Sequence, residues 1–164
     1  MQRALDAQRV WKSRMQMFQA ALSRHDSESL SGLLEQAGLR PNDFAPLPVS
    51  AGLHTACSME NVYRGSPWAR ALLDLIPELR IAAVGEAGQC CGAAGDYMLR
   101  RPQTAASLRD PVVEQTVCGE HPLLLTGNVG CAMHLAAGLR ERGARVQVLH
   151  PVELLARQLL GRKG

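Results

Sequence analysis

The alternation of short apolar runs with helical patterns over residues 52–160 constrains the fold of this chain most strongly. Strands are expected at residues 52–56, 80–84, 123–126 and 145–149. Helices are expected at residues 67–75, 97–114 (one or two helices around Pro102 and Pro111), 132–142 and 152–160. We expect the strand at 80–84 to be buried and to end at Gly85. Such alternation predicts an α/β fold, a small parallel sheet with flanking helices.

The region before this alternation has a different pattern. Residues 4–23 carry an apolar stripe at helical spacing, and residues 27–37 form a second expected helix that ends at Gly38. Three prolines then follow within residues 41–48, which is typical of a linker because proline fixes the backbone and removes donors. We therefore divide the chain into an N-terminal helical segment, a Pro-rich linker and a cysteine-rich domain, at residues 1–40, 41–50 and 51–164.

Composition excludes several functional classes. The formal net charge is +3 and the charges are dispersed, which argues against nucleic-acid binding. No stretch approaches the roughly 20 apolar residues needed to cross a bilayer, and the N-terminus lacks a signal-peptide core, so we expect a cytoplasmic protein. Five cysteines, two of them adjacent, do not suit a disulfide framework. In a reducing compartment they indicate metal or redox chemistry.

Four of the cysteines follow expected strands. They are Cys57, the adjacent Cys90 and Cys91, and Cys131. Because the carboxyl ends of parallel strands meet at one edge of a sheet, loops distant in sequence can bring these sulfurs together. Thiolates are the soft ligands that iron–sulfur clusters and zinc prefer, so the pattern predicts a thiolate-bound metal centre. Cys118 stands alone and is expected to be a small buried side chain.

Glycines flank these cysteines. Glycine lets a backbone turn sharply and approach a ligand closely, so Gly92, Gly127 and Gly130 are expected to shape the loops around the bound group. Cys131 stands where a helix is expected to begin, and the helix N-terminus should lower the pKa of its thiol.

At these residues the sequence resembles the CCG family of cysteine-rich domains. That family includes the glycolate oxidase iron–sulfur subunit, lactate-utilisation iron–sulfur proteins and a subunit of heterodisulfide reductase. Its pattern is a cysteine, Cys-Cys-Gly and Cys-x-x-Cys, separated by gaps of thirty-odd residues; here the gaps are 32 residues (58–89) and 38 residues (93–130). The resemblance is greatest to the C-terminal domain of the glycolate oxidase subunit. It rests on His54-Thr55-Ala56-Cys57, Cys90-Cys91-Gly92-Ala93-Ala94-Gly95-Asp96-Tyr97, Thr126-Gly127-Asn128-Val129-Gly130-Cys131 and His150-Pro151-Val152-Glu153-Leu154-Leu155.

The resemblance implies a non-catalytic iron–sulfur subunit or domain that transfers electrons, with a cluster of the 4Fe-4S type on Cys57, Cys90, Cys91 and Cys131. Its implied partners are a flavin-bearing dehydrogenase subunit that oxidises glycolate or lactate, and other iron–sulfur domains. Any association with a membrane would be peripheral and through these partners.

The sequence departs from the family at two points. The final cysteine of the family pattern is replaced by His134, one helical turn after Cys131, so His134 is a further candidate ligand. The chain also shows one CCG domain and no ferredoxin-like Cys-x-x-Cys-x-x-Cys run, so it is expected to be a terminal piece of such a subunit or a stand-alone relative.

Two alternatives stay open. A structural zinc site could use four thiolates, or three thiolates and an imidazole. A metal-free interaction module could instead use Cys90 and Cys91 as redox-active thiols. A nucleotide-binding enzyme is set aside, because residues 85–95 contain neither a Gly-x-Gly-x-x-Gly nor a phosphate-loop pattern.

Overall fold

The computed structural model describes residues 39–61 and 66–160. The chain divides into two units between Arg40 and Pro41, and the fold concerns the second unit. The helices expected at residues 4–23 and 27–37 lie outside the described residues. None of the described helices is both long enough and apolar enough to cross a membrane.

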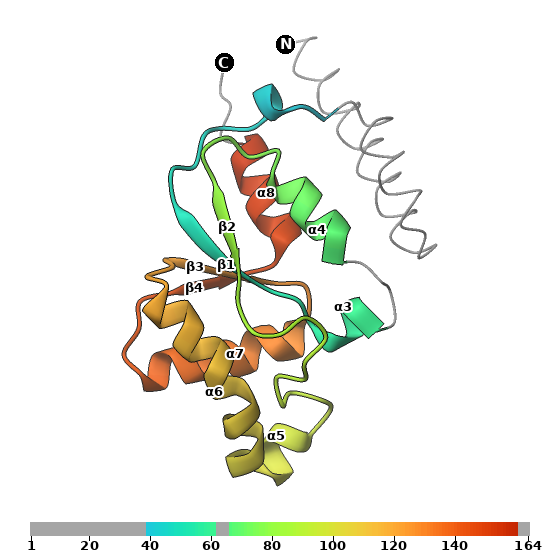
Figure 1. The fold of residues 1–164 in the computed structure, drawn as a ribbon, viewed down its shortest axis with the longest axis vertical. Coiled ribbons are helices and arrows are strands. Elements are labelled where there is room, and N and C mark those ends of the chain that lie inside the picture. The colour runs from blue at the N-terminus through green and yellow to red at the C-terminus, as the bar shows by residue number, and fades with distance from the viewer. Residues whose placement is uncertain (1–38, 62–65, 161–164) are drawn as a thin grey trace. The chain divides into compact units, whose positions relative to one another are not determined.

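Four parallel strands form the sheet at the centre of the domain (Figure 1). In the order in which they lie side by side they are β2 (Arg80–Ala83), β1 (Ser50–His54), β3 (Leu123–Thr126) and β4 (Gln147–Leu149). The pairing of Leu53 with both Ala83 and Leu125 aligns the carboxyl ends of the three strands β2, β1 and β3. The predicted α/β class with a parallel sheet is therefore confirmed, and one edge of the sheet presents three adjacent strand ends.

Helices cover both faces of the sheet. Figure 1 shows α4 beside α8 on one face, and α6 with α7 on the other. In chain order the helical elements are the 3-10 turn η1 (Pro41–Asp43), α3 (Cys57–Asn61), α4 (Ser66–Leu73), α5 (Tyr97–Arg100), α6 (Pro102–Cys118), α7 (Val129–Glu141) and α8 (Pro151–Leu160). The short helix α3 was not expected from the sequence. It begins at Cys57, so the first cysteine lies on a helix rather than in an open loop.

The core is aliphatic, as the scarcity of aromatic residues requires. On the face covered by α6 and α7, Leu124 of β3 packs with apolar side chains of both helices. The buried residues of this core cluster are Ala56, Val84, Cys91, Ala93, Val112, Val113, Leu124, Cys131, Leu135 and Leu139. Cys91 and Cys131 thus belong to the hydrophobic core, so the positions of their sulfurs depend on the packing of α6 and α7.

The prediction of a buried strand at 80–84 is wrong. β2 is an edge strand paired only with β1, and Arg80 and Ala83 are exposed. Only Val84, just beyond the strand, reaches the core. An apolar run of this length does not reveal whether a strand lies at the centre or at the edge of a sheet.

The two prolines of the expected 97–114 segment have different effects. The helical conformation is interrupted at Arg101, between α5 and α6. Pro102 lies in the first turn of α6, where a backbone N–H has no partner within the helix and the N–H that proline lacks is not needed. Pro111 lies inside α6, and the helix continues past it to Cys118. Packing of α6 on α7 thus outweighs the local cost of the proline.

The Pro-rich stretch contacts the domain along its length. Phe44 is buried, the Ala45 amide donates to the Gln158 carbonyl at 3.2 Å, and the Leu47 amide donates to the Pro77 carbonyl at 2.9 Å. The division of the chain at residues 40 and 50 stays a prediction.

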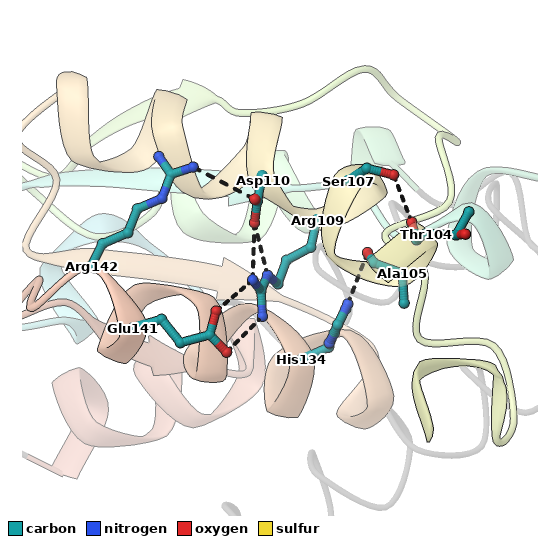
Figure 2. Close-up of polar contacts among 8 residues, drawn as sticks. All are labelled: Thr104, Ala105, Ser107, Arg109, Asp110, His134, Glu141 and Arg142. Atoms are coloured by element: carbon teal, nitrogen blue, oxygen red, sulfur yellow. Dashed lines mark hydrogen bonds and ion pairs between the residues drawn. The ribbon is translucent and has the colours of Figure 1, made fainter. Parts of the chain in front are cut away.

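An ion pair between a buried arginine and an exposed glutamate ties α6 to α7 (Figure 2). Arg109 donates from its two terminal nitrogens to Glu141 at 3.2 and 2.7 Å, and it also contacts Asp110 at 3.0 Å. Gly138 makes room for it, because a Cβ there would lie 2.5 Å from Arg109 Nε. These two helices therefore have a fixed register close to the loops that carry the cysteines.

Candidate metal centre

Three chain segments bring four cysteines to the carboxyl edge of the sheet. Cys57 follows β1 and is the first residue of α3; Cys90 and Cys91 lie between β2 and α5; Cys131 lies in the first turn of α7, after β3. Since β1 lies between β2 and β3, the three segments emerge side by side.

Cys91 and Cys131 form the inner pair of sulfurs. Their Sγ atoms lie 2.8 Å apart, and both side chains are buried in the core described above. The residues come from segments 40 positions apart in sequence, so only the folded sheet brings them into contact.

Cys57 and Cys90 form the outer pair, and both are half-buried. Burial raises the pKa of Cys57, the negative charges of Cys90 and Cys91 raise it further, and so does a hydrogen bond with Cys90. The two pairs influence each other as well, because the charges of Cys57 and Cys90 also raise the pKa of Cys131. The four sulfurs thus form one electrostatically linked group.

The inner pair does not ionise as the helix position of Cys131 suggested. The hydrogen bond with Cys131 lowers the pKa of Cys91 to about 7. The same contact, together with burial, raises the pKa of Cys131, so the proton between the two sulfurs stays on Cys131 when Cys91 ionises. Backbone hydrogen bonds lower the pKa of Cys91, whereas the charges of Cys57 and Cys90 raise that of Cys131, so Cys91 ionises first. The expected lowering of the Cys131 pKa by the helix N-terminus is therefore wrong.

The sulfurs stand closer than a shared metal ion allows. Two thiolates on one tetrahedral zinc ion would lie about 3.8 Å apart, given Zn–S bonds of about 2.3 Å. Within residues 39–61 and 66–160, no group of three or more His, Cys, Asp or Glu side chains is arranged to hold a metal ion. The donor set itself, four thiols from three segments, suits a single soft metal ion once Cys91 and Cys131 separate by about 1 Å. An iron–sulfur cluster, in which each thiolate binds a different iron, requires a larger separation.

Two of the three expected glycines have a steric role. Gly92 has a φ of +82°, and a Cβ there would lie 2.6 Å from the carbonyl oxygen of Ala105. At Gly130 a Cβ would lie 3.3 Å from Asn128 Oδ1, a tight contact, and 3.4 Å from the carbonyl oxygen of Ala93 in the Cys-Cys loop. At Gly127 a Cβ would make only an ordinary contact with Met59, at 3.6 Å.

Asn128 connects two of the cysteine segments and was not singled out from the sequence. Its side-chain oxygen caps α7 by accepting from the Cys131 amide at 3.1 Å, and its amide nitrogen donates to Ser58 Oγ at 3.4 Å. It thus joins the turn of Cys131 to the helix of Cys57. The signal was present, because asparagine three residues before Cys131 is a preferred N-cap.

The two nearby histidines are both buried and hydrogen-bonded. His134 donates from Nε2 to the carbonyl oxygen of Ala105 on α6 at 3.1 Å (Figure 2). His54 Nδ1 lies 3.0 Å from Thr126 Oγ1, joining the ends of β1 and β3. Ligation by His134 stays a prediction, and this structure shows its ring facing α6.

Cys118 does not belong to this group. It is the last residue of α6 and is exposed, so the expectation that it is a buried packing residue is wrong. Cys118 is exposed because it lies at the end of α6, where Thr116 is the last residue of the helix to be buried.

Comparisons with known proteins agree with this arrangement. A family model described as a cysteine-rich domain, CCG, matches residues 51–136. Lactate utilization protein A 2 of Bacillus cereus (strain 03BB102) is 27% identical over 122 residues, which is 74% of this chain and 50% of that protein. Lactate utilization protein A 1 of Bacillus anthracis (strain CDC 684 / NRRL 3495) has the same identity and coverage. The glycolate oxidase iron-sulfur subunit of Escherichia coli (strain K12) is 29% identical over 107 residues, or 65% of this chain and 25% of that subunit.

The chain therefore spans about half the length of the lactate utilization relatives. No solved structure matches it. The family model covers just over half of the chain and contains all three cysteine segments that meet at the sheet edge, and the chain belongs to the CCG family of cysteine-rich domains.

Proposed function

We propose that this chain carries an iron–sulfur cluster, of the 4Fe-4S type, on Cys57, Cys90, Cys91 and Cys131 and transfers electrons within a larger oxidoreductase. The observation that carries the proposal is the meeting of these four thiols, from three segments, at one edge of the sheet. Four thiolates are the usual ligand set of such a cluster. When bound, the cluster would accept and release single electrons.

The residues around the sulfurs would serve this role in distinct ways. Gly92 lets the Cys-Cys loop lie against α6, and Asn128 fixes the turn that carries Cys131. The core side chains around Cys91 and Cys131 exclude water from the inner half of the site. Low dielectric and limited solvent access are the levers by which a protein tunes the potential of a cluster.

We assign substrate oxidation to a partner. His54, the histidine at the end of β1, is buried and engaged by Thr126, and burial lowers its pKa to about 4, so it is a poor general base. The family resemblance implies that the partner would be a flavin-bearing dehydrogenase subunit, with further iron–sulfur domains completing the electron path. The names of the relatives, lactate utilization protein and glycolate oxidase subunit, favour lactate or glycolate as its substrate.

The decisive experiment is anaerobic reconstitution with iron and sulfide, followed by quantitation of iron, sulfide and zinc and by EPR after reduction. We expect Cys91→Ser to abolish stable iron binding, because it removes an enclosed ligand. The matched control is Cys118→Ser, which changes an exposed thiol outside the group and should retain the iron content of the unaltered protein. Equal iron content in the two variants would refute the ligand assignment.

A second candidate function, a thiol-redox module, is favoured by one observation. The 2.8 Å contact between Cys91 and Cys131 is close to what a disulfide requires, and the lowered pKa of Cys91 provides a thiolate near neutral pH. This candidate predicts a colourless protein that gains a Cys91–Cys131 disulfide under mild oxidation and takes up no iron. Stoichiometric zinc in the same metal analysis would instead indicate the structural zinc site.

A further inference from the structure

His134 occupies a particular place relative to the cysteines. It lies on α7 one turn after Cys131 and is buried, with an exposed fraction of 7%. Its Nε2 donates to the carbonyl oxygen of Ala105, which lies in the first turn of α6 and is completely buried (Figure 2). A buried hydrogen bond of this kind fixes the separation and the register of the two helices at this turn.

The loop that carries Cys90 and Cys91 packs against this same carbonyl group. A Cβ at Gly92 would lie 2.6 Å from the Ala105 oxygen and 2.8 Å from its Cα, so the backbone directly after Cys91 is in close contact with Ala105. Ala105 therefore contacts a neighbour of each cysteine of the inner pair. It contacts Gly92, the residue after Cys91, and it accepts a hydrogen bond from His134, one helical turn after Cys131.

We propose that His134 is a positioning residue for the metal centre, which by its hydrogen bond to Ala105 fixes Cys131 relative to the loop that carries Cys91. This inference rests on the proposed function. It differs from ligation by His134, in which a ring nitrogen would bind iron directly. A ligating histidine also commonly donates its second nitrogen to a carbonyl, so the two roles must be separated by experiment.

The effect of removing this hydrogen bond should be local. One to two turns further along the same helices, Arg109 and Glu141 hold α6 to α7 through two hydrogen bonds of their own. A variant of His134 would thus retain the helix pair and lose only the alignment at the turn of Cys131. Cluster retention, rather than folding, is the property we expect to change.

Two substitutions separate the roles. His134→Gln places an amide nitrogen as many bonds from Cα as Nε2, so it can still donate to Ala105, whereas His134→Leu cannot. We expect the Gln variant to keep the iron content and EPR spectrum of the unaltered protein. The Leu variant should lose iron to a ferrous chelator about tenfold faster. Met133→Leu, at the exposed neighbouring position, is the matched control and should match the unaltered protein.

The result that would overturn the inference is nitrogen hyperfine coupling to the cluster in protein labelled with 15N-histidine, or an equal loss of iron in the Gln and Leu variants. The coupling would make His134 a ligand, and the equal loss would show that its hydrogen bond to Ala105 does not retain the iron. Iron retention by the Leu variant equal to that of the unaltered protein would remove any role for the residue. If the Leu variant failed to fold by circular dichroism, the Gln variant and the labelled protein would still decide. Absence of iron from the unaltered protein would instead refute the proposed function itself.

Discussion

His54 lies at the end of the central strand, where the sheet meets the cysteine segments. Its ring is completely enclosed and shares a 3.0 Å hydrogen bond with Thr126. Burial lowers its pKa from 6.5 to about 4, because the charged imidazolium would lose its hydration there. The residue is therefore neutral in the folded protein at neutral pH.

This shift makes stability depend on pH. The unfolded chain takes up the proton near pH 6.5 and the folded protein only near pH 4, so the contribution of His54 is complete above pH 6.5 and is lost as the pH falls toward 4. We expect the free energy of unfolding of the metal-free protein to fall by about 3 kcal/mol over this interval from this group alone. Denaturant titrations at several pH values measure it.

The control for this prediction separates His54 from other titrating groups. His54→Asn should flatten the slope of stability against pH between 6.5 and 4, because it removes the group whose pKa burial lowers. A slope that survives in the Asn variant would assign the effect to other side chains.

The meeting of the four cysteines at one edge of the sheet could be predicted from the sequence, because segments that follow neighbouring parallel strands emerge at the same edge. Their pairing could not be predicted. It depends on α3, which turns Cys57 toward Cys90, and on the core packing that encloses Cys91 with Cys131. The exposure of Cys118 likewise depends on how α6 is rotated about its axis, which an isolated cysteine does not reveal.

At the scale of elements, the loop of Cys90 and Cys91 is seated on α6 through Gly92. Substitution by alanine there meets two costs, the positive φ of +82° and a clash of the new Cβ with the backbone of Ala105. We expect Gly92→Ala to lower the free energy of unfolding by about 3 kcal/mol or more, since a backbone contact cannot move aside as a side chain can.

Gly95 in the same loop is the matched control. Its φ is +54°, and a Cβ there would have nothing within 4 Å, so Gly95→Ala carries the cost of the backbone conformation alone. We expect about 1 kcal/mol for it. Chemical denaturation of the two variants side by side gives the difference, and equal destabilisation would show that the contact with Ala105 is not tight in solution.

Element boundaries were predicted unevenly, for physical reasons. The run at 123–126 coincides with β3, because both neighbours of this strand and both helix layers bury it. The first strand is shifted: it spans Ser50–His54 rather than 52–56, since the chain turns into α3 immediately after Ala56. A five-residue helix has too few residues to show a periodicity, so tertiary contacts rather than local sequence define it.

At the scale of the molecule, the sheet and its aliphatic core do not depend on a bound metal for most of their contacts. Leu124, Leu135 and Leu139 are completely or almost completely buried by other apolar side chains of the domain. We therefore expect the metal-free domain to unfold cooperatively, and the loaded domain to unfold about 5 °C or more higher, because only the folded state presents the four thiolates together.

Differential scanning calorimetry before and after removal of iron by a chelator checks this prediction. Circular dichroism should show the same helix and strand content in both states. Loss of the cooperative transition in the metal-free protein would mean that the centre is needed to fold the domain, as in small zinc domains.

The unequal burial of the two sulfur pairs has a consequence for how the site is filled. If the site takes up iron as proposed, iron from bulk water would meet the half-exposed thiols of Cys57 and Cys90 first, because Cys91 and Cys131 lie buried and in contact with each other. Loading would then proceed from the surface inward, and its final step would be the separation of two sulfurs that core side chains enclose.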